Sequence, residues 1–188
     1  MPHSPTPADV PLDAGDRRRA VVVTASDGVA SGHRSDGSGD AVTTQLTGAG
    51  FRVVERVVVP DDRSTIAERL RELVDAGGVT LIVVTGGTGF GPRDVTPEAT
   101  RDVIDREAPG LSEAMRASGR ASTPMADLSR GVCGVRGSTL LVDLPGSPRG
   151  ATESLAAVLG LLPHAIDLLA GDTREHPAGH GEHGEPAS

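Results

Sequence analysis

The residues best suited to chemistry stand together in one run of this chain, Thr85-Gly86-Gly87-Thr88-Gly89-Phe90-Gly91-Pro92-Arg93-Asp94. Glycines let main-chain N–H groups close on phosphate oxygens without interference from side chains. The carboxylate of Asp94 would repel a bound phosphate, and a Mg²⁺ ion between them would remove that repulsion. The run therefore predicts a phosphate-binding loop with a metal ion beside it; a tight turn without a ligand is the alternative. Phe90 either flanks a ligand in this loop or folds back against the domain.

The segments on either side of the glycine loop indicate how it is positioned. Residues 79–84 precede it, and their apolar character predicts a buried strand. Beyond the loop, Thr96 is suited to cap a helix whose first residue is Pro97. We therefore expect the loop between the carboxyl end of a strand and the start of a helix, where open α/β sheets bind their ligands.

Strands and helices are expected to alternate along most of the chain. Apolar runs predict strands at 18–24, 53–59, 79–84 and 138–144. Helical spacing of apolar residues predicts helices over 63–76, 97–106, 110–119 and 151–170, and one that carries Val42 and Leu46 and stops at Gly50. Pro163 is expected to interrupt the last helix, and residues 120–130 are expected to be irregular. The alternation predicts one domain over residues 17–171, a Rossmann-like, three-layer αβα sandwich with a mostly parallel central sheet.

Three polar loops, at 24–39, 85–95 and 144–150, follow predicted strands. In a parallel sheet such loops meet at one edge and can form one site. The third loop joins a strand to the start of a helix, which suits an anion, and Arg149 would add a fixed positive charge.

A second carboxylate is expected beside the glycine loop. Asp61 follows the strand at 53–59 and should emerge at the same edge as Asp94. Two carboxylates from neighbouring strand ends can hold a hydrated Mg²⁺ on a nucleotide. Capping of the next helix is the alternative for Asp61, and it also accounts for Asp62.

Composition excludes several classes of function. The formal net charge is −8 and every basic residue is Arg, so the chain lacks the Gly-Lys-Ser/Thr sequence of a Walker P-loop and any long basic stripe for nucleic acid. Trp and Tyr are absent, which weakens any single-strand stacking surface. The single cysteine, Cys133, cannot form a disulfide within the chain and fits a reducing compartment; its apolar context favours an inert buried thiol over a nucleophile. No apolar run reaches the roughly 18 residues of a membrane span, and no apolar signal core begins the chain, so a cytoplasmic protein is expected.

Both ends of the chain lack apolar periodicity. Residues 1–16 are rich in Pro, Ala and Asp and predict a disordered leader, and residues 172–188 predict a disordered tail. His176, His180 and His183 lie in that tail and could bind a metal weakly, but a solvated tail is favoured.

Taken together, these motifs resemble one known family, the molybdopterin adenylyltransferases of molybdenum cofactor biosynthesis: the Mog and MoaB proteins, the G domain of gephyrin and its plant counterpart. The resemblance covers about residues 18–170. The residues that carry it are Ser26-Asp27 with Gly32, Asp36 and Gly39; Val59-Pro60-Asp61; the run Thr85 to Ala99; Ala108-Pro109-Gly110-Leu111 with Met115 and Arg116; Leu128-Ser129-Arg130; and Leu144-Pro145-Gly146-Ser147-Pro148-Arg149.

The resemblance implies a reaction, in which the terminal phosphate of molybdopterin attacks the α-phosphorus of Mg-ATP to give adenylylated molybdopterin and pyrophosphate. It implies that Asp61 and Asp94 are the catalytic pair and hold Mg²⁺. The implied binding residues are Gly86, Gly87, Thr88 and Gly89 for phosphate; Pro109, Gly110, Pro145, Gly146, Ser147 and Arg149 for the nucleotide; and Ser26, Asp27 and Gly32 for the pterin. A homotrimer, with a hexamer as the alternative, and a downstream molybdenum insertase are the implied partners.

Two other functions share the same motifs. A non-catalytic protein that binds or carries molybdopterin would use the same loops. The related domain of molybdenum insertases or competence-damage-type proteins is a third possibility, but those proteins have extra domains for which this length leaves no room. Arg149 stands where many family members have Lys, which keeps the charge but changes its geometry. The presence of both Asp61 and Asp94 favours the enzyme.

Overall fold

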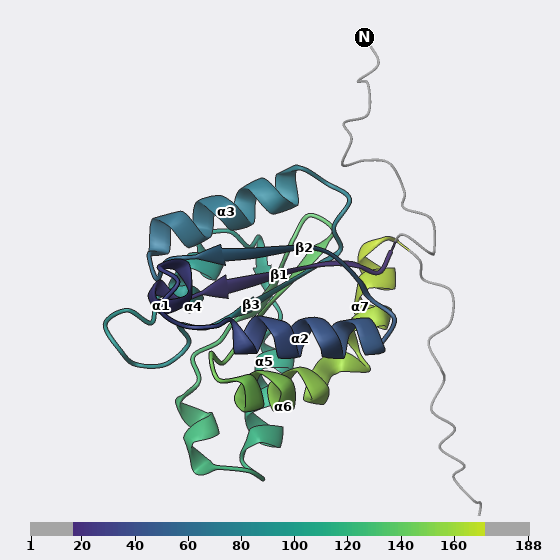
Figure 1. Cartoon of the computed structure of the whole chain (residues 1–188). Helices are drawn as coiled ribbons and strands as arrows, with labels where there is room; N and C mark the ends of the chain where they lie inside the picture. Colours follow the sequence, from purple (N-terminus) through teal and green to yellow (C-terminus); the bar gives the residue numbers. More distant parts are fainter. Residues whose placement is uncertain (1–16, 172–188) are drawn as a thin grey trace, which may run out of the picture.

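A computed structural model describes residues 17–171, which form a six-stranded sheet in the order β2-β1-β3-β6-β5-β4. Four strands run parallel (Figure 1): β1 (Arg19–Ala25), β2 (Arg52–Val59), β3 (Leu81–Thr85) and β6 (Thr139–Leu144). Two short strands, β5 (Cys133–Arg136) and β4 (Arg106–Glu107), extend the sheet in antiparallel fashion beyond β6. The predicted mostly parallel sheet is thereby confirmed.

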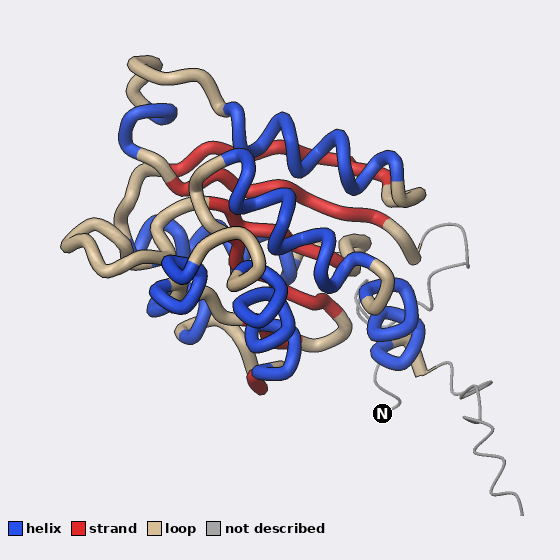
Figure 2. Tube along the Cα trace, turned by 90° about the horizontal axis from the view of Figure 1, so that it is seen from below, coloured by secondary structure: helices blue, strands red, loops and turns tan. Residues whose placement is uncertain are grey.

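Helices cover both faces of this sheet, which confirms the predicted αβα sandwich (Figures 1 and 2). One face is covered by α2 (Gly37–Gly48), α5 (Pro109–Gly119), α6 (Pro148–Leu159) and α7 (Leu162–Leu169). The opposite face is covered by α3 (Arg63–Asp75) and α4 (Thr96–Arg101). Two short elements lie outside these layers: α1 (Asp27–Ala30) and the 3₁₀ helix η2 (Pro124–Leu128).

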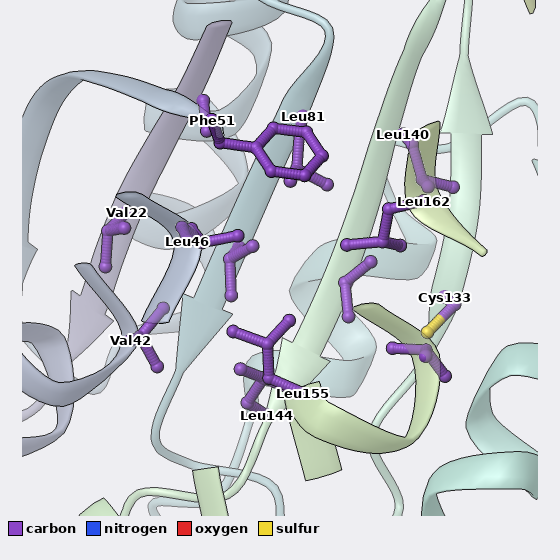
Figure 3. Packing of buried hydrophobic residues seen from close by; sticks show 14 of the residues in the cluster. Val22, Val42, Leu46, Phe51, Leu81, Cys133, Leu140, Leu144, Leu155 and Leu162 are labelled. Carbon is purple, nitrogen blue, oxygen red and sulfur yellow. The ribbon is translucent and has the colours of Figure 1, made fainter. Parts of the chain in front are cut away.

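Successive residues of the central strands supply the two halves of the core. In β1, Ala20 and Val22 pack under α2 and α6, whereas Val21 and Val23 pack under α3. This alternation follows from the two-residue period of a strand that is buried on both faces. Phe51 packs with aliphatic side chains in the first half (Figure 3). The sheet is thus a rigid base for the loops at its carboxyl edge.

The largest departure from the predicted elements lies after α4. The helix expected over 97–106 ends at Arg101, and the chain then pairs with β5 through the bond from Asp105 N–H to Val135 O, 2.8 Å. The strands β4 and β5 were not predicted, because they are short and Gly134 interrupts the apolar pattern. Glycine is favoured at position 134, since an added Cβ would lie 2.9 Å from the backbone oxygen of Arg106.

Three helix boundaries also differ from prediction. Val95, not Thr96, is the N-cap of α4, and no side chain caps that helix. Residues 120–130 contain η2 rather than irregular chain alone. The expected helix over 151–170 begins earlier, at Pro148, and is two helices bent by 60°; the predicted interruption by Pro163 is confirmed, with Pro163 in the first turn of α7.

The predicted disordered segments, 1–16 and 172–188, and the three histidines of the latter lie outside the described residues. Within residues 17–171, no single helix is long and apolar enough to cross a membrane; only the bent pair α6 and α7 would pass, on length and composition alone. The inward faces of that pair supply core residues, among them Leu155 and Ile166.

Candidate active site

The carboxyl ends of the parallel strands are joined to one another by hydrogen bonds. The N–H of Gly86 donates to Leu144 O (3.1 Å), and the Thr85 hydroxyl donates to Pro145 O (2.7 Å). On the other side, Ser26 N–H donates to Val59 O (2.9 Å). β1 lies between β2 and β3, so the connection after β1 and the connection after β3 lead to opposite sides along the sheet. This edge therefore contains a topological switch point, where such sheets bind ligands.

The glycine loop that follows β3 depends on glycine at two positions. Gly86 and Gly87 have φ angles of 106° and 61°. A Cβ at Gly86 would lie 2.1 Å from Ala25 O, and a Cβ at Gly87 would lie 2.6 Å from Thr96 Oγ1. These glycines are therefore fixed by backbone conformation and by close approach of neighbouring chain.

Three consecutive amides of this loop are left free. The carbonyls of Gly87, Thr88 and Gly89 accept hydrogen bonds from Thr96 N–H (3.1 Å), Arg130 N–H (2.9 Å) and Arg130 Nε (2.7 Å), respectively. In contrast, the N–H groups of the same three residues donate to no acceptor within residues 17–171. Anchored carbonyls and free N–H groups are what an oxyanion-binding loop needs.

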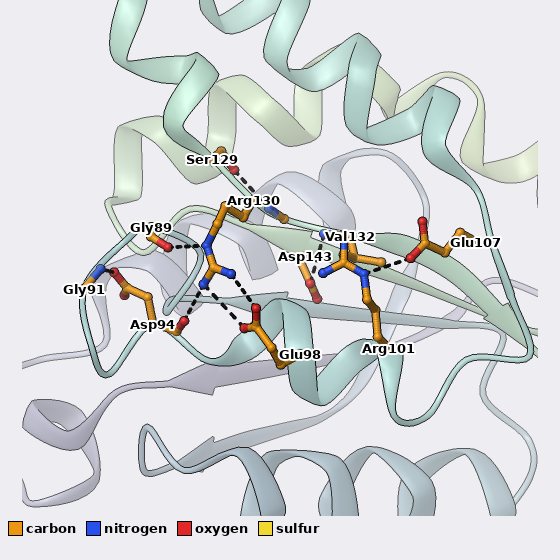
Figure 4. Close-up of polar contacts among 11 residues, drawn as sticks. Gly89, Gly91, Asp94, Glu98, Arg101, Glu107, Ser129, Arg130, Val132 and Asp143 are labelled. Atoms are coloured by element: carbon orange, nitrogen blue, oxygen red, sulfur yellow. Dashed lines mark hydrogen bonds and ion pairs between the residues drawn. The ribbon is translucent and has the colours of Figure 1, made fainter.

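The side chain of Arg130, which precedes β5, holds the glycine loop in place (Figure 4). Besides Gly89 O, its guanidinium donates to Asp94 O (2.6 Å) and forms an ion pair with Glu98 on α4. This ion pair lowers the pKa of Glu98. The Phe90 ring lies 5.8 Å from the same guanidinium, and Phe90 is 71% exposed, so it does not fold back into the domain.

Of the two predicted catalytic carboxylates, Asp94 ends the glycine loop and Asp61 lies against the loop at Gly87. Asp94 Oδ2 accepts from Gly91 N–H (2.7 Å), and Asp61 Oδ2 accepts from Asp27 N–H (2.9 Å). Their Oδ1 atoms accept no hydrogen bond from any described residue. Asp61 Oδ1 lies 3.5 Å from the Cβ position of Gly87, which places this carboxylate against the loop.

Asp27 has a structural role in this arrangement. Its carboxylate accepts from Asp61 N–H (3.0 Å) and forms a bidentate ion pair with Arg93 (Nη2 to Oδ2, 2.7 Å). The pair is exposed and contributes little stability. It does connect the loop after β1 to the glycine loop and to the strand end that carries Asp61.

A pocket of about 450 Å³ opens beside the glycine loop, between α5, η2 and the start of α6. The predicted residues that line it are Gly87, Thr88, Gly89, Asp94, Pro145, Gly146 and Ser147. The predicted residues that do not line it are Ser26, Asp27, Gly32, Asp61, Gly86, Pro109, Gly110 and Arg149.

Several of the predicted site residues that do not line the pocket have other contacts. Ser26 caps α1 by accepting from Val29 N–H (3.3 Å), and Pro109 and Gly110 form the first turn of α5. The Arg149 side chain is 79% exposed and pairs with Glu153 (2.7 Å), so its charge offsets that of a carboxylate that lines the pocket.

The inward face of α5 lines the pocket and was not predicted to do so. Ser112, Met115, Arg116 and Gly119 share this face because they are spaced by three and four residues. The helix itself was expected, but its contact with the glycine loop is tertiary. Helical spacing in a sequence identifies the residues that share a helix face. It does not show whether that face contacts the core or a ligand, which depends on the neighbouring elements.

Asp143 is a further pocket residue that was not predicted. Its carboxyl is buried, with Oδ1 accepting from the Thr100 hydroxyl (2.8 Å) and Oδ2 accepting from Val132 N–H (3.1 Å). Burial raises the pKa of Asp143 to about 7, because the loss of water outweighs both hydrogen bonds. It lies inside the apolar run of β6, where the sequence pattern indicates core.

Two smaller predictions are settled at this site. Cys133 is buried and burial raises the pKa of its thiol to about 12, which confirms an inert thiol. Asp62, not Asp61, caps α3, since its carboxylate accepts from Thr65 N–H (2.9 Å).

Known proteins match this chain over nearly all of its described residues. The family model described as "Probable molybdopterin binding domain" matches residues 21–164. The chain is 37% identical over 153 residues to a molybdopterin adenylyltransferase of Helicobacter pylori strain J99, with 80% of this chain and 87% of that protein covered. It is 40% identical over 153 residues to the molybdenum cofactor synthesis protein cinnamon of Drosophila melanogaster, but there it spans only 25% of the relative's length and 80% of its own. The crystal structure of the molybdopterin biosynthesis enzyme MoaB from Thermus thermophilus superposes with a TM-score of 0.77 at 52% identity, covering 81% of this chain and 96% of that one.

Proposed function

Because this chain belongs to the molybdopterin-binding family of molybdenum cofactor biosynthesis, we propose that it is a molybdopterin adenylyltransferase. An oxygen of the terminal phosphate of molybdopterin attacks the α-phosphorus of ATP. The bond from that phosphorus to the oxygen it shares with the β-phosphate breaks. The products are adenylylated molybdopterin and pyrophosphate.

The free amides of the glycine loop are the observation that carries this proposal. Gly87, Thr88 and Gly89 direct three N–H groups to no described acceptor, and all three residues line the pocket. A reaction between two anions needs positioned hydrogen-bond donors more than a strong base. The loop offers those donors on a backbone that Arg130 and Thr96 already hold in place.

The donor set also fits a Mg²⁺ ion. Asp61 and Asp94 each keep one carboxylate oxygen without a described partner, and they lie against the same loop. No group of three or more His, Cys, Asp or Glu side chains within residues 17–171 could hold a metal, so a site of two carboxylates would need phosphate oxygens and water to complete it. When bound, Mg²⁺ would neutralise charge on the phosphates.

Loss of either carboxylate should stop the transfer. We expect Asp61→Ala and Asp94→Asn each to slow pyrophosphate release from Mg-ATP and molybdopterin by about 10²-fold or more, while pterin binding largely survives. Asp62→Asn is the matched control, because the neighbouring carboxylate of Asp62 caps α3. The melting temperature of this variant should fall, and its turnover should stay near that of wild type. Wild-type turnover in the Asp94 variant would refute the metal assignment.

The same experiment separates the enzyme from a non-catalytic molybdopterin carrier, which would bind the pterin and release no pyrophosphate. We further propose a homotrimer in the cytoplasm that passes its product to a molybdenum insertase.

A further inference from the structure

The pocket beside the glycine loop is short of positive charge. Among the described residues that line it, Asp94, Asp143 and Glu153 are acidic and Arg116 alone is basic. The polyphosphate of a nucleotide carries several negative charges, and its binding there needs a cation that the chain itself provides or a metal ion. Arg149, the cation expected from the sequence, forms an ion pair with Glu153 and so offsets the charge of one of these three carboxylates.

Arg116 has unused hydrogen-bonding capacity. It is half-buried on α5, and its guanidinium makes one long hydrogen bond, from Nη1 to Ser129 O (3.4 Å). It forms no ion pair with any carboxylate in residues 17–171. A guanidinium has five N–H donors, so most of them are available to a ligand.

The position of Ser129 places Arg116 beside the glycine loop. Ser129 directly precedes Arg130, whose N–H donates to Thr88 O (2.9 Å) and whose guanidinium holds Gly89 O. Among the described residues, the one hydrogen bond of the Arg116 guanidinium is therefore to the segment that is hydrogen bonded to the loop. Free Arg116 donors and free loop amides thus line the same pocket.

Ser112 gives an independent indication of a ligand on this helix face. It lies one turn before Arg116, is only 5% exposed and lines the pocket, and no nitrogen or oxygen atom of the described residues is hydrogen bonded to its hydroxyl. The buried thiol of Cys133 interacts with this hydroxyl, but a thiol is a weak hydrogen-bond partner. A buried hydroxyl without a partner costs stability, and a bound ligand would offset that cost.

We propose that Arg116, together with the Ser112 hydroxyl, binds the polyphosphate of the nucleotide and completes the anion site that the glycine loop begins. This assignment rests on the proposed function for the identity of the anion. Arg116 is then the charge that draws the triphosphate into the pocket, and pyrophosphate is held by the same group after the transfer.

Calorimetric titration with magnesium tripolyphosphate tests the proposal without any turnover. We expect Arg116→Gln to weaken its affinity by about 10- to 100-fold, the size of a lost charged hydrogen bond, and Arg116→Lys to lose less. Arg69→Gln is the matched control: Arg69 is on α3, across the sheet, where it pairs with Glu55 and Glu72. Equal affinity in the Arg116→Gln and Arg69→Gln variants would overturn the proposal.

Ser112→Ala separates a ligand contact from a structural role. We expect its melting temperature without ligand to match or exceed that of wild type, and its tripolyphosphate affinity to fall severalfold. A lower melting temperature with unchanged affinity would remove Ser112 from the site. If Arg116→Gln weakens binding of molybdopterin but not of tripolyphosphate, the anion is the pterin phosphate and the proposal is wrong.

Adenylyl transfer is measured separately on the wild-type protein. If tripolyphosphate binding depends on Arg116 but the wild-type protein transfers no AMP, this inference is supported and the proposed function is refuted. If the wild-type protein transfers AMP but its tripolyphosphate affinity does not depend on Arg116, the proposed function is supported and this inference is refuted.

Discussion

Asp143 places a titratable carboxyl in the wall of the pocket, with 1% of the residue exposed. The pKa of about 7 means that it is partly protonated near neutral pH. In its neutral form the acid can donate to Thr100 Oγ1 and still accept from Val132 N–H, so both neighbours remain satisfied. In its charged form it is a buried anion, and the attraction of Arg101 offsets only part of the cost of burial.

This residue should make stability depend on pH. An unfolded aspartate has a pKa of about 3.9, so between there and about pH 7 the folded protein holds a proton that the unfolded chain has released. The contribution of this proton to the free energy of unfolding is complete below about pH 4 and is lost as pH rises through about 7. Asp143→Asn keeps the donor and acceptor pattern of the neutral acid and removes the titration.

We therefore expect the free energy of unfolding of Asp143→Asn, relative to wild type, to rise by about 2–3 kcal/mol between about pH 5 and pH 8. Urea unfolding of both proteins across that range measures it. Other titrating groups cancel in the difference, so a difference that does not change with pH would contradict the raised pKa.

At the scale of elements, Arg130 joins the glycine loop to the start of β5 and to α4. Its bonds to Gly89 O and Asp94 O in the loop and its ion pair with Glu98 on α4 connect Arg130 to residues that precede it by 32 to 41 positions (Figure 4). The loop has few apolar contacts of its own, and Phe90 at its tip is exposed. The guanidinium therefore holds the Gly89 and Asp94 end of the loop, whereas backbone N–H groups of Thr96 and Arg130 hold Gly87 O and Thr88 O.

Arg130→Gln should loosen the loop without unfolding the domain. We expect amide hydrogen exchange in residues 88–94 to become about tenfold faster or more, because local opening no longer breaks three charged contacts. Arg101→Gln is the control on α4, since Arg101 forms an exposed pair with Glu107 and makes no hydrogen bond to the glycine loop within residues 17–171. Exchange rates in residues 88–94 that are alike in the two variants would show that other contacts hold the loop.

At the scale of the whole molecule, the parallel part of the fold could be predicted from sequence because each strand contains an apolar run and three of the four are followed by Gly or Pro: Pro60, Gly86 and Pro145. The strands β4 and β5 could not, since two to four residues carry no period and their pairing is decided by tertiary contacts. The site divides in the same way. Loop residues such as Gly87 and Asp94 follow directly from local sequence, whereas Arg116 and Asp143 reach the pocket only through packing of α5 and β6.

The proposed homotrimer is a property of the assembled molecule. β2 is an edge strand of the sheet, and its Val54 and Val58 are 37% and 41% exposed. Light scattering at micromolar concentration should give three times the 19.1 kDa mass of the chain. A mass equal to one chain would refute the trimer.

The central claim is that the chain joins AMP to molybdopterin. Mass spectrometry of the reaction mixture, after incubation of the protein with Mg-ATP and molybdopterin, tests it most directly. Adenylylated molybdopterin should form in equal amount to pyrophosphate, and Asp94→Asn should form almost none. Molybdopterin recovered unmodified from wild-type protein that binds both substrates would contradict the account and leave a pterin carrier in its place.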